Sequence, residues 1–383
     1  MQIFSKRIIA QILCSPCRRV TVDKRFLRNS STNKLLKGTF RIGLTGITVG
    51  ALLGTGYSIH YYNKPRAHIL NEEITIPTVK EIPDIKPTRV IKNYQDRSGL
   101  ELTLYQYQTC PFCCKVRAFL DYYGISYNVI EVDPVLRQAI KWSPYRKVPI
   151  LVAKVDDGFQ PLNDSTMIIS ALASYLFDNN NKNLPEIVKC FPLISYVDDD
   201  GIKKNEIMNR YFLMLNNVKY QTAEEINSEE RKWRKWADNV LVHTLSPNVY
   251  RTKDEALQAF NWFSEVGEWE ANFPIWERYL MIYVGASAMW LIGKKLKKRH
   301  NLKDDVRQSL YDECNYWLRA VKSKGGQFMG GSRPNLADLA VYGVLSSIEG
   351  CLAFKDLLEN TKIGGWYYNM KRNIAQHEGA TMI

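Results

Sequence analysis

The stretch LELTLYQYQTCPFCCKVRAFLDYY, residues 100–123, decides the fold of this chain. Apolar and polar side chains alternate over residues 100–107, which predicts a half-buried strand, and residues 115–123 carry a helical pattern. The tetrapeptide Cys110-Pro111-Phe112-Cys113 therefore lies where a strand turns into a helix. A Cys-x-x-Cys at this position is the arrangement of a redox-active or thiol-binding site.

The first sulfur of the tetrapeptide is placed for activation. Unpaired backbone N–H groups and the macrodipole at a helix N-terminus stabilise a thiolate, which lowers the pKa of the thiol. Pro111 suits the first helical turn, where its missing N–H would have no partner. Tyr107 precedes Cys110 by three residues, and a hydrogen bond from its hydroxyl would tune the thiolate. We expect Cys110 to be the reactive thiol, with Cys113 as the second thiol.

A zinc site is the structural alternative for a Cys-x-x-Cys pair. The second such pair in the sequence, Cys14 to Cys17, lies in an N-terminal segment that has the character of targeting sequence. Cys190, Cys314 and Cys351 stand alone, and no His pair with ligand spacing complements the tetrapeptide. The pattern favours thiol chemistry and predicts no metal.

Two further motifs follow a second predicted strand, residues 127–132. Val148-Pro149 enters a third strand, an unusual place for proline, and a cis peptide bond would explain it. That geometry would leave the Val148 backbone free to pair with a bound peptide. Asp164 and Ser165 open a helix and would present N–H groups and a hydroxyl to a carboxylate. A thiol partner, a backbone clamp and a carboxylate site together suit glutathione.

The charge of the chain is unevenly distributed. Residues 1–41 carry ten Lys or Arg against the single acid Asp23, so about +9 of the formal net charge of +13 lies there. An Arg-rich, acid-poor start resembles a mitochondrial transit peptide, with a signal-anchor flank as the alternative. The remaining charge of about +4 does not indicate a nucleic-acid-binding surface.

Residues 42–63 contain no Asp, Glu, Lys or Arg, which is enough length for a single transmembrane anchor. Residues 64–98 carry four prolines and mixed charges, and we expect an extended linker. A second apolar stretch, residues 279–293, is too short for a confident span, so we expect a buried helix of an all-helical domain. Asn335 and Asp338 have the spacing of a helix capping box.

Several motifs together resemble a known family. Cys-Pro-Phe-Cys (110–113), Tyr-Arg-Lys-Val-Pro-Ile-Leu (145–151) and Leu-Asn-Asp-Ser (162–165) form a thioredoxin-fold, glutaredoxin-like signature. With Ser-Pro-Asn-Val-Tyr-Arg-Thr (246–252) and the stretch 328–343, the chain resembles the type 2 membrane-associated prostaglandin E synthases of the glutathione-transferase-like superfamily. The likeness covers about residues 100 to 375.

The resemblance implies an isomerase that converts prostaglandin H2, or a related lipid endoperoxide, to prostaglandin E2. It implies that Cys110 is the catalytic thiol, helped by Tyr107 and Cys113. It implies that glutathione is bound by Phe112, Val148, Pro149, Asp164 and Ser165.

The family can also carry haem with glutathione. The haem contacts that this implies are His243, Ser246, Lys295 and Arg299, although Lys295 stands where the family usually has arginine and His243 could equally be a core histidine. The sequence has no haem ligand motif of its own.

The expected fold class is α+β, a thioredoxin-like domain followed by an all-helical domain behind a single anchor. The expected segments are a basic flank (1–41), an anchor (42–63), a linker (64–98), a thioredoxin-like domain (99–190), a connecting segment (191–228) and a helical domain (229–383). We expect a homodimer at the Golgi membrane or in the mitochondrion. The alternatives are a glutaredoxin-like thiol–disulfide oxidoreductase or glutathione transferase, and a membrane-anchored glutathione- or haem-binding protein.

Overall fold

The cysteine tetrapeptide lies between a strand and a helix, as the sequence predicts. Strand β3 (Leu102–Gln106) leads into helix α2 (Pro111–Tyr122), and strand β4 (Tyr127–Glu131) returns parallel to β3. The computed structural model describes residues 68–177, 183–197, 201, 203–215 and 224–383. All of these except Gly201 belong to one compact unit.

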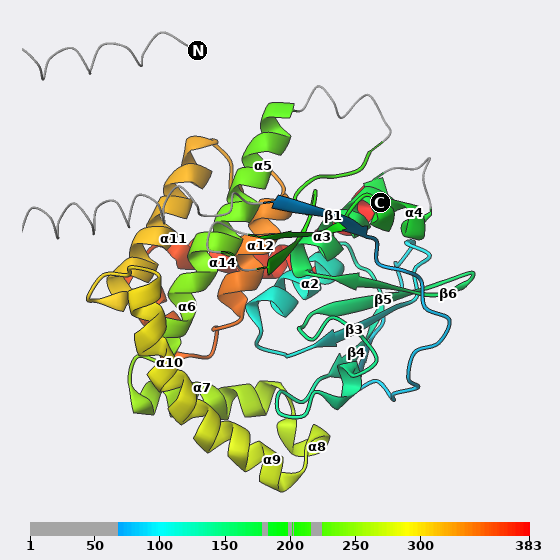
Figure 1. The fold of residues 1–383 in the computed structure, drawn as a ribbon. Coiled ribbons are helices and arrows are strands. Elements are labelled where there is room, and N and C mark those ends of the chain that lie inside the picture. Colours follow the sequence, from blue (N-terminus) through cyan, green and yellow to red (C-terminus); the bar gives the residue numbers. More distant parts are fainter. Residues whose placement is uncertain (1–67, 178–182, 198–200, 202, 216–223) are drawn as a thin grey trace, which may run out of the picture. The chain divides into compact units, whose positions relative to one another are not determined.

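A five-stranded mixed sheet carries the tetrapeptide (Figure 1). Its strand order is β2-β4-β3-β5-β6, with β2 at Arg89–Ile91, β5 at Ile150–Val155 and β6 at Gly158–Asn163. The β3–β4 pair is parallel and the other pairs are antiparallel. Helix α3 (Ser165–Phe177) follows β6 and lies beside α2. This arrangement is the expected thioredoxin-like half of the fold.

The prediction of an extended linker over residues 64–98 is wrong for the described part of that segment, because this part is built into the sheets. Strand β2 pairs with β4 and closes one edge of the five-stranded sheet, and Val79 bridges to Phe159. Strand β1 (His68–Ile74) joins a second, antiparallel sheet with β7 (Leu193–Val197) and β8 (Lys203–Ile207). Main-chain hydrogen bonds therefore hold residues for which the proline content and the mixed charges had predicted an extended linker.

Most of the rest of the described chain is helical. The short helix α4 (Leu184–Lys189) precedes β7. The helices and helical turns that follow β8 are α5 (Glu224–Trp236), η4 (Ala237–Leu241), α6 (Val242–Val249), α7 (Lys253–Val266), α8 (Trp269–Asn272), α9 (Ile275–Tyr279), η5 (Leu280–Gly285), α10 (Ala286–Arg299), α11 (Val306–Ser323), α12 (Leu336–Ser346), α13 (Leu352–Asn360), α14 (Ile363–Ala375) and η6 (Glu378–Met382). Short turns also occur within the sheet half, as at η2 (Gln138–Ile140).

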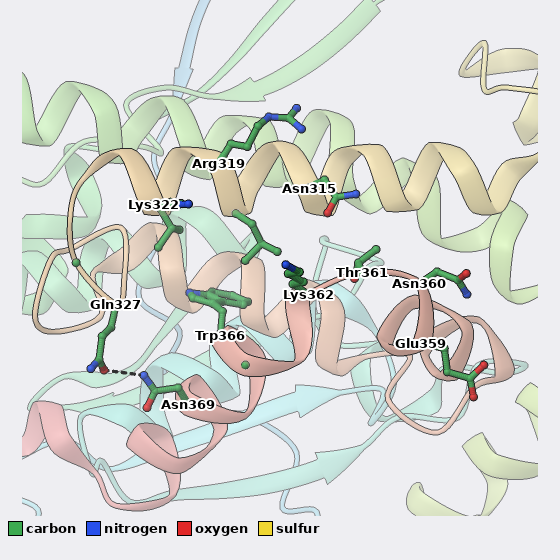
Figure 2. A pocket seen from close by; sticks show the side chains of 14 residues that line it. Asn315, Arg319, Lys322, Gln327, Glu359, Asn360, Thr361, Lys362, Trp366 and Asn369 are labelled. Carbon is green, nitrogen blue, oxygen red and sulfur yellow. Dashed lines mark hydrogen bonds between the residues drawn. The ribbon is translucent and has the colours of Figure 1, made fainter.

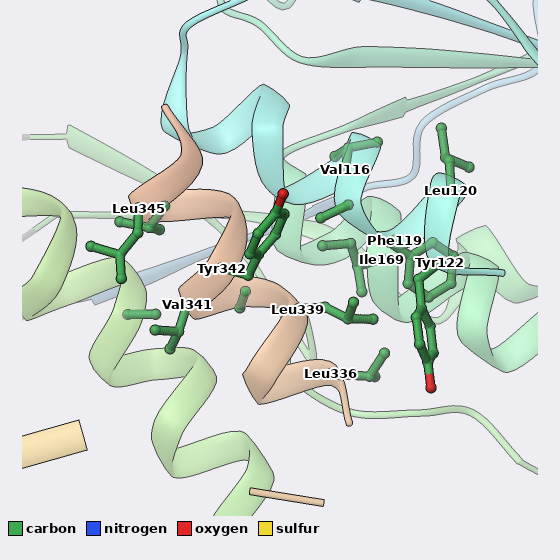
Figure 3. Close-up of a cluster of buried hydrophobic side chains, with 14 of the residues drawn as sticks. Val116, Phe119, Leu120, Tyr122, Ile169, Leu336, Leu339, Val341, Tyr342 and Leu345 are labelled. Atoms are coloured by element: carbon green, nitrogen blue, oxygen red, sulfur yellow. The ribbon is translucent and has the colours of Figure 1, made fainter. Parts of the chain in front are cut away.

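Helix α12 packs directly against the helix that carries the cysteines (Figure 3). Val116 and Phe119 of α2 meet Leu339 of α12 in one buried cluster. A Cβ atom added to Gly343 would lie 2.5 Å from the Lys115 Cα, so the crossing of the two helices requires glycine here. This close contact fixes α2, and therefore the tetrapeptide, against the helical half.

The predicted capping box is confirmed at the start of α12. The Asn335 side chain accepts hydrogen bonds from the N–H groups of Ala337 and Asp338, and the Asp338 carboxylate accepts from the N–H of Asn335. Asp338 also accepts from the Trp366 indole N–H. Its carboxyl is fully buried, and burial raises its pKa to about 6.

The apolar stretch 279–293 was expected to form a buried helix, and that expectation is wrong for one of its faces. Helices α9 and α10 lie in the helical half (Figure 1), and with η5 between them they present one apolar side to solvent. The exposed large apolar residues on these elements are Ile275, Trp276, Tyr279, Leu280, Tyr283, Val284, Leu291 and Ile292. Met281, Ile282 and Ala286 are buried, so the helix packs by its opposite face only.

Among the described residues no helix is both long and apolar enough to cross a membrane. The predicted anchor, residues 42–63, and the predicted targeting segment, residues 1–41, lie outside the described residues.

Candidate functional site

The Cys110 sulfur lies at the N-cap of α2, at the position that the sequence predicts. Cys110 has an extended backbone, and its carbonyl accepts the first helical hydrogen bond, from the Cys114 N–H. The pKa of the Cys110 thiol is lowered, first by a hydrogen bond from the Cys113 thiol and then by the backbone N–H groups of Cys113 and Phe112. The Arg117 guanidinium adds to this lowering. Cys110 is partly exposed, so an activated sulfur is open to a reactant.

Cys113 is fully buried and has the opposite character. Burial, together with the hydrogen bond to Cys110, raises the pKa of its thiol well above the ordinary value. Cys113 belongs to a small buried cluster with Tyr105, Val148 and Ile150, and Cys110 packs against that cluster. The two thiols therefore differ in role, since one is favoured as a thiolate and the other keeps its proton.

Two phenols border the sulfurs. The pKa of Tyr107 is raised to about 12, chiefly by burial and in smaller part by the charges of Cys110 and Cys113, which places the phenol within electrostatic reach of both sulfurs. Burial likewise raises the pKa of Tyr145, to which Asp164 and both cysteines contribute. Both phenols remain protonated at neutral pH and can act as hydrogen-bond donors.

Val148 and Pro149 form the edge of the site nearest the cysteines. The Val148–Pro149 peptide bond is cis, as predicted. Both residues are buried, and Val148 lies in the same cluster as Cys113 just before strand β5 begins. Phe112 is partly exposed on the first turn of α2, and the Lys115 Nζ lies 5.8 Å from its ring centroid.

Asp164 and Ser165 are positioned at the start of α3, but their polar groups are largely engaged. The Oδ1 atom of Asp164 accepts hydrogen bonds from the N–H groups of Thr166 and Met167. These two N–H groups are therefore not free for a ligand, although the sequence had predicted that N–H groups at this helix start would be. The buried Ser165 hydroxyl accepts from the Lys115 ammonium at 3.3 Å. The second carboxylate oxygen of Asp164 faces a different partner.

That partner is Arg210, whose Nη1 lies 3.3 Å from the Asp164 Oδ2. Both side chains are 26% exposed, so the pair is open on one side. Arg210 belongs to the irregular segment after β8, and its carbonyl accepts a hydrogen bond of 2.6 Å from the buried Ser170 hydroxyl. Its guanidinium also lies over the Tyr211 ring, 5.1 Å from the centroid. A residue distant in sequence is therefore held at the end of the candidate site.

A buried ion pair joins the two halves of the molecule behind the site. The Lys115 ammonium of α2 pairs with Asp238 of η4, which also accepts hydrogen bonds from the hydroxyls of Thr166 and Tyr211. Although burial pushes the pKa of Asp238 upward, Lys115 and these hydroxyls lower it overall. The pair fixes the cysteine helix against the helical half.

The four residues expected to contact haem lie on α6 and α10. The ring of His243 stacks on that of His300, with centroids 4.1 Å apart. Burial lowers the pKa of His243, and the charges of His300 and Arg299 lower it further, so its imidazole is neutral at pH 7. Ser246 is partly buried on α6, and a Cβ added to Gly293 would lie 3.6 Å from its carbonyl oxygen, so α6 and α10 meet there. Lys295 and Arg299 are exposed on α10.

Two cavities among the described residues lie apart from Cys110 and Cys113, since neither cysteine lines them. A wide groove of about 840 Å³ lies between α11 and α14 and is lined by Arg319, Lys322 and Trp366 among others, and none of the predicted site residues lines it (Figure 2). A cavity of about 250 Å³ is lined by Cys114 and Arg117 but by neither Cys110 nor Cys113. Within the described residues, no group of three or more His, Cys, Asp or Glu could hold a metal ion.

The sequence interpretation missed Tyr145, Arg210 and the Lys115–Asp238 pair. Tyr145 begins the quoted motif 145–151, so its place beside Val148-Pro149 was an available signal. Arg210 and Asp238 carry no such signal, because only the tertiary structure brings them to α2 and α3.

The part of the chain that carries the cysteine tetrapeptide matches a known protein family. Residues 104–180 match the family of glutathione S-transferase N-terminal domains. The chain is similar to glutathione transferase F7 of Populus trichocarpa, at 13% identity and a TM-score of 0.40, covering 73% of this chain and 99% of that one. It is also similar to the beta-etherase LigF of Sphingobium sp. strain SYK-6, at 18% identity and a TM-score of 0.41, covering 72% and 98% of the two chains.

Two curated relatives are much more similar. Prostaglandin E synthase 2 of Mus musculus is 44% identical over 344 residues, which cover 89% of this chain and 83% of the relative. Prostaglandin E synthase 2 of Danio rerio is 49% identical over 278 residues, which cover 72% of this chain and 71% of the relative. The matched region includes both halves of the fold and the reactive thiol that the structure places at the start of α2. On this evidence the chain belongs to the prostaglandin E synthase 2 family.

Proposed function

We propose that this chain is an isomerase that converts prostaglandin H2 to prostaglandin E2 at the Cys110 thiolate. The observation that carries the proposal is the division between the two thiols, since Cys110 has a lowered pKa and partial exposure whereas Cys113 is buried and protonated. A thiolate is the nucleophilic form of cysteine, and the family relationship supplies the substrate class.

The reaction needs no net oxidation or reduction. The Cys110 sulfur attacks the endoperoxide oxygen on the carbon that becomes the ketone, an S–O bond forms, and the O–O bond breaks. The other oxygen leaves as an alkoxide and takes a proton. Loss of the proton from the adjacent C–H bond then forms the carbonyl and breaks the S–O bond, which returns the thiolate.

Tyr107 is suited to the two proton movements. Its raised pKa keeps the phenol protonated at neutral pH, so it can donate a proton to the departing alkoxide. The phenolate formed in this way can accept the proton of the C–H bond, after which both residues have returned to their starting states. Cys113 supports the cycle by hydrogen bonding to the Cys110 thiolate.

We propose glutathione as the bound thiol cofactor. The residues that would hold it lie on the first turn of α2, just before β5 and at the start of α3. They are Phe112, Val148, Pro149, Asp164 and Ser165. Their fit rests on a buried strand edge at Val148-Pro149 and a carboxylate at Asp164. When bound, glutathione would supply a second thiol near Cys110.

Haem binding near α6 and α10 is a further proposal. The residues present fit the group chemically, because the imidazole rings of His243 and His300 are possible ligands and the cations Lys295 and Arg299 suit propionates. Titration of the full chain with haem, with and without glutathione, should give a Soret band that His243→Ala weakens and that the distant control His377→Ala does not. An identical band in all three proteins would remove these residues from the proposal.

Thiol–disulfide exchange is the second candidate function, and one observation favours it. The side chains of Cys110 and Cys113 interact and both thiols are free, so the pair can close to a disulfide. Cys113→Ser separates the two activities, because dithiol reduction of a disulfide substrate requires both thiols whereas isomerisation requires Cys110. Isomerisation that vanishes in Cys113→Ser but survives in Cys110→Ser would overturn the assigned roles.

We propose that residues 42–63 attach the chain to a membrane, at the Golgi or in the mitochondrion. The support is the absence of formally charged residues over this stretch and the basic residues before it. Alkaline carbonate extraction of cells expressing the full chain should leave it in the membrane pellet. Deletion of residues 42–63 should release it to the supernatant.

We also propose a homodimer formed through the apolar face of α9, η5 and α10. Contiguous exposed apolar surface of this kind marks an interaction site, and Ser287 and Ala288 on the same side allow a close helix approach. The exposed acids Glu265, Glu268 and Glu270 precede this face. A basic group, Lys294, Lys295, Lys298 and Arg299, ends it. A two-fold axis across the face would place the acidic end of one copy against the basic end of the other.

A further inference from the structure

Arg117 of α2 is held by neutral acceptors and forms no ion pair with a carboxylate of the described residues. Its Nη1 donates to the Gln106 Oε1 at 2.6 Å, and its Nη2 donates to the Gln108 carbonyl at 2.7 Å and to the Cys114 sulfur at 3.2 Å. Burial raises the pKa of Cys114, so this thiol keeps its proton at neutral pH. The guanidinium charge of Arg117, which a protein cannot remove by deprotonation, therefore stays unbalanced by its direct contacts.

A second guanidinium at the same end of the sheet provides the contrast. Arg89 of β2 also reaches Gln108 and donates to its Oε1 at 2.6 Å, but it is paired with the Glu131 carboxylate at 3.3 Å. Glu131 in turn accepts a hydrogen bond of 3.1 Å from the buried side chain of Gln106. The charge of Arg89 is thus balanced locally, whereas the same two glutamines hold Arg117 in place without a counter-ion.

The contacts of Arg117 lie on both sides of Cys110 in the chain. Gln108 precedes Cys110 by two residues, and Cys114 follows it by one helical turn, with its N–H bonded to the Cys110 carbonyl at 2.9 Å. The Arg117 side chain therefore extends back along α2 toward the N-terminus, where the helix macrodipole is also positive. A cation in this place favours the thiolate form of a cysteine at the helix start.

The other ionisable groups that face Cys110 among the described residues supply no positive charge. They are the thiols of Cys113 and Cys114 and the phenols of Tyr107, Tyr145 and Tyr250, and burial is the main cause that raises the pKa of each. The groups that face Arg117 are Cys113, Cys114, Asp121 and Tyr127. Burial raises the pKa of Asp121, and its Oδ1 accepts a hydrogen bond from the Tyr127 hydroxyl at 2.8 Å.

We infer that Arg117 is a positioning residue for the reaction, whose charge, held behind the first turn of α2, keeps Cys110 in the thiolate form. The inference rests on the proposed function, in which that thiolate attacks the endoperoxide. Arg117 lines the cavity of about 250 Å³, which Cys110 does not line, so it acts through the field of its charge and not by contact with the substrate. The hydrogen bonds from Gln106 and Gln108 fix the direction from which that field acts.

The pH dependence of Cys110 alkylation tests the inference on the full chain in detergent. Iodoacetamide labelling, located on Cys110 by tandem mass spectrometry, gives the midpoint of thiolate formation. Arg117→Gln should move this midpoint upward by about 1 unit, the low end of the shift that a nearby opposite charge produces, so that labelling well below the midpoint slows about tenfold. Arg117→Lys keeps the charge and should restore most of the shift. The matched control Arg319→Gln removes an exposed arginine of the groove between α11 and α14 and should match the wild type.

Chemical rescue separates the charge of Arg117 from its packing. Arg117→Ala enlarges the cavity that Gln108 and Cys114 line, so a free guanidinium ion can enter and meet the same acceptors. Added guanidinium should return the Cys110 midpoint of this variant toward the wild type. Urea, which has nearly the same shape but no charge, should leave the midpoint where it is. The glutamine and lysine variants carry the test if the alanine variant does not fold.

Prostaglandin E2 formation by the same proteins distinguishes this inference from the proposed function. Turnover by Arg117→Gln should be reduced at neutral pH and should approach the wild type above the shifted midpoint, because the thiolate is then restored. An unchanged Cys110 midpoint in Arg117→Gln, a shift confined to Cys114, or equal effects of guanidinium and urea would overturn the inference. A shifted midpoint in proteins that form no prostaglandin E2 would overturn the proposed reaction and support the action of Arg117 on the thiol.

Discussion

The side chains of Cys110 and Cys113 interact, and the pKa values of the two thiols are shifted in opposite directions, that of Cys110 downward and that of Cys113 upward. The contact follows from the placement of the pair on the first turn of α2, with Cys110 at the N-cap and Cys113 pointing into the buried cluster around Tyr105. The opposite pKa shifts make Cys110 the nucleophile, and Cys113 is the residue that stabilises the Cys110 thiolate.

Removing the donor should raise the pKa of Cys110. Cys113→Ala should move the midpoint of Cys110 alkylation by iodoacetamide to higher pH, by about 1 to 2 units for the loss of one hydrogen bond to a charged sulfur. Cys113→Ser should move it less, because the hydroxyl can still donate. Mass spectrometry resolves Cys110 from the exposed Cys190. An unchanged midpoint in the alanine variant would show that the backbone N–H groups alone set the pKa.

The Lys115–Asp238 pair should contribute strongly to stability as long as both charges are present. Lys115→Ala or Asp238→Ala leaves one buried charge without a partner and should lower the free energy of unfolding by about 3–5 kcal/mol. The double replacement Lys115→Met with Asp238→Leu should cost less than either single change. Denaturant titration measures all three, and the exposed pair Lys154–Glu101 provides the control, since Lys154→Ala should cost about 0–1 kcal/mol.

The same pair predicts the direction of acid destabilisation. The pKa of Asp238 is lower in the folded protein than in the unfolded chain, so its contribution is complete above the unfolded pKa of about 4 and is lost as the pH falls below it. The melting temperature of Asp238→Asn should be lower at pH 7 and should fall less steeply below pH 4 than that of the wild type. Parallel acid profiles for the two proteins would mean that other carboxylates dominate.

The apolar face of α9, η5 and α10 should control the oligomeric state. Leu291→Glu or Val284→Glu places a charge within the proposed dimer interface and should convert the full chain in detergent from dimer to monomer, as measured by light scattering after size exclusion. Leu352→Glu, on a similarly exposed leucine of α13, is the matched control and should leave the dimer intact. A dimer that survives both substitutions while binding to lipid vesicles is lost would assign the face to a membrane instead.

Local patterns predicted the part of the site that is continuous in sequence. Strand β3, helix α2, the cis Val148–Pro149 bond and the capping box at Asn335 all depend on residues within a few positions of one another, which is the range over which periodicity and capping act.

Tertiary contacts decided the rest. Proline content gave no sign that β2 would complete the sheet, because edge pairing depends on the exposed edge of β4. The uncharged run 279–293 was read as buried, although an apolar helix face can equally be reserved for a partner. Arg210 reaches Asp164 only through the hairpin of β7 and β8, which no local motif marks.

Product analysis of prostaglandin H2 incubated with the full chain tests the central claim most directly. Wild type, Cys110→Ser and Cys113→Ser are compared with and without glutathione, against the spontaneous background. The account predicts prostaglandin E2 from the wild type, a reduced amount from Cys113→Ser and only background from Cys110→Ser. Equal prostaglandin E2 formation by Cys110→Ser and the wild type would contradict it.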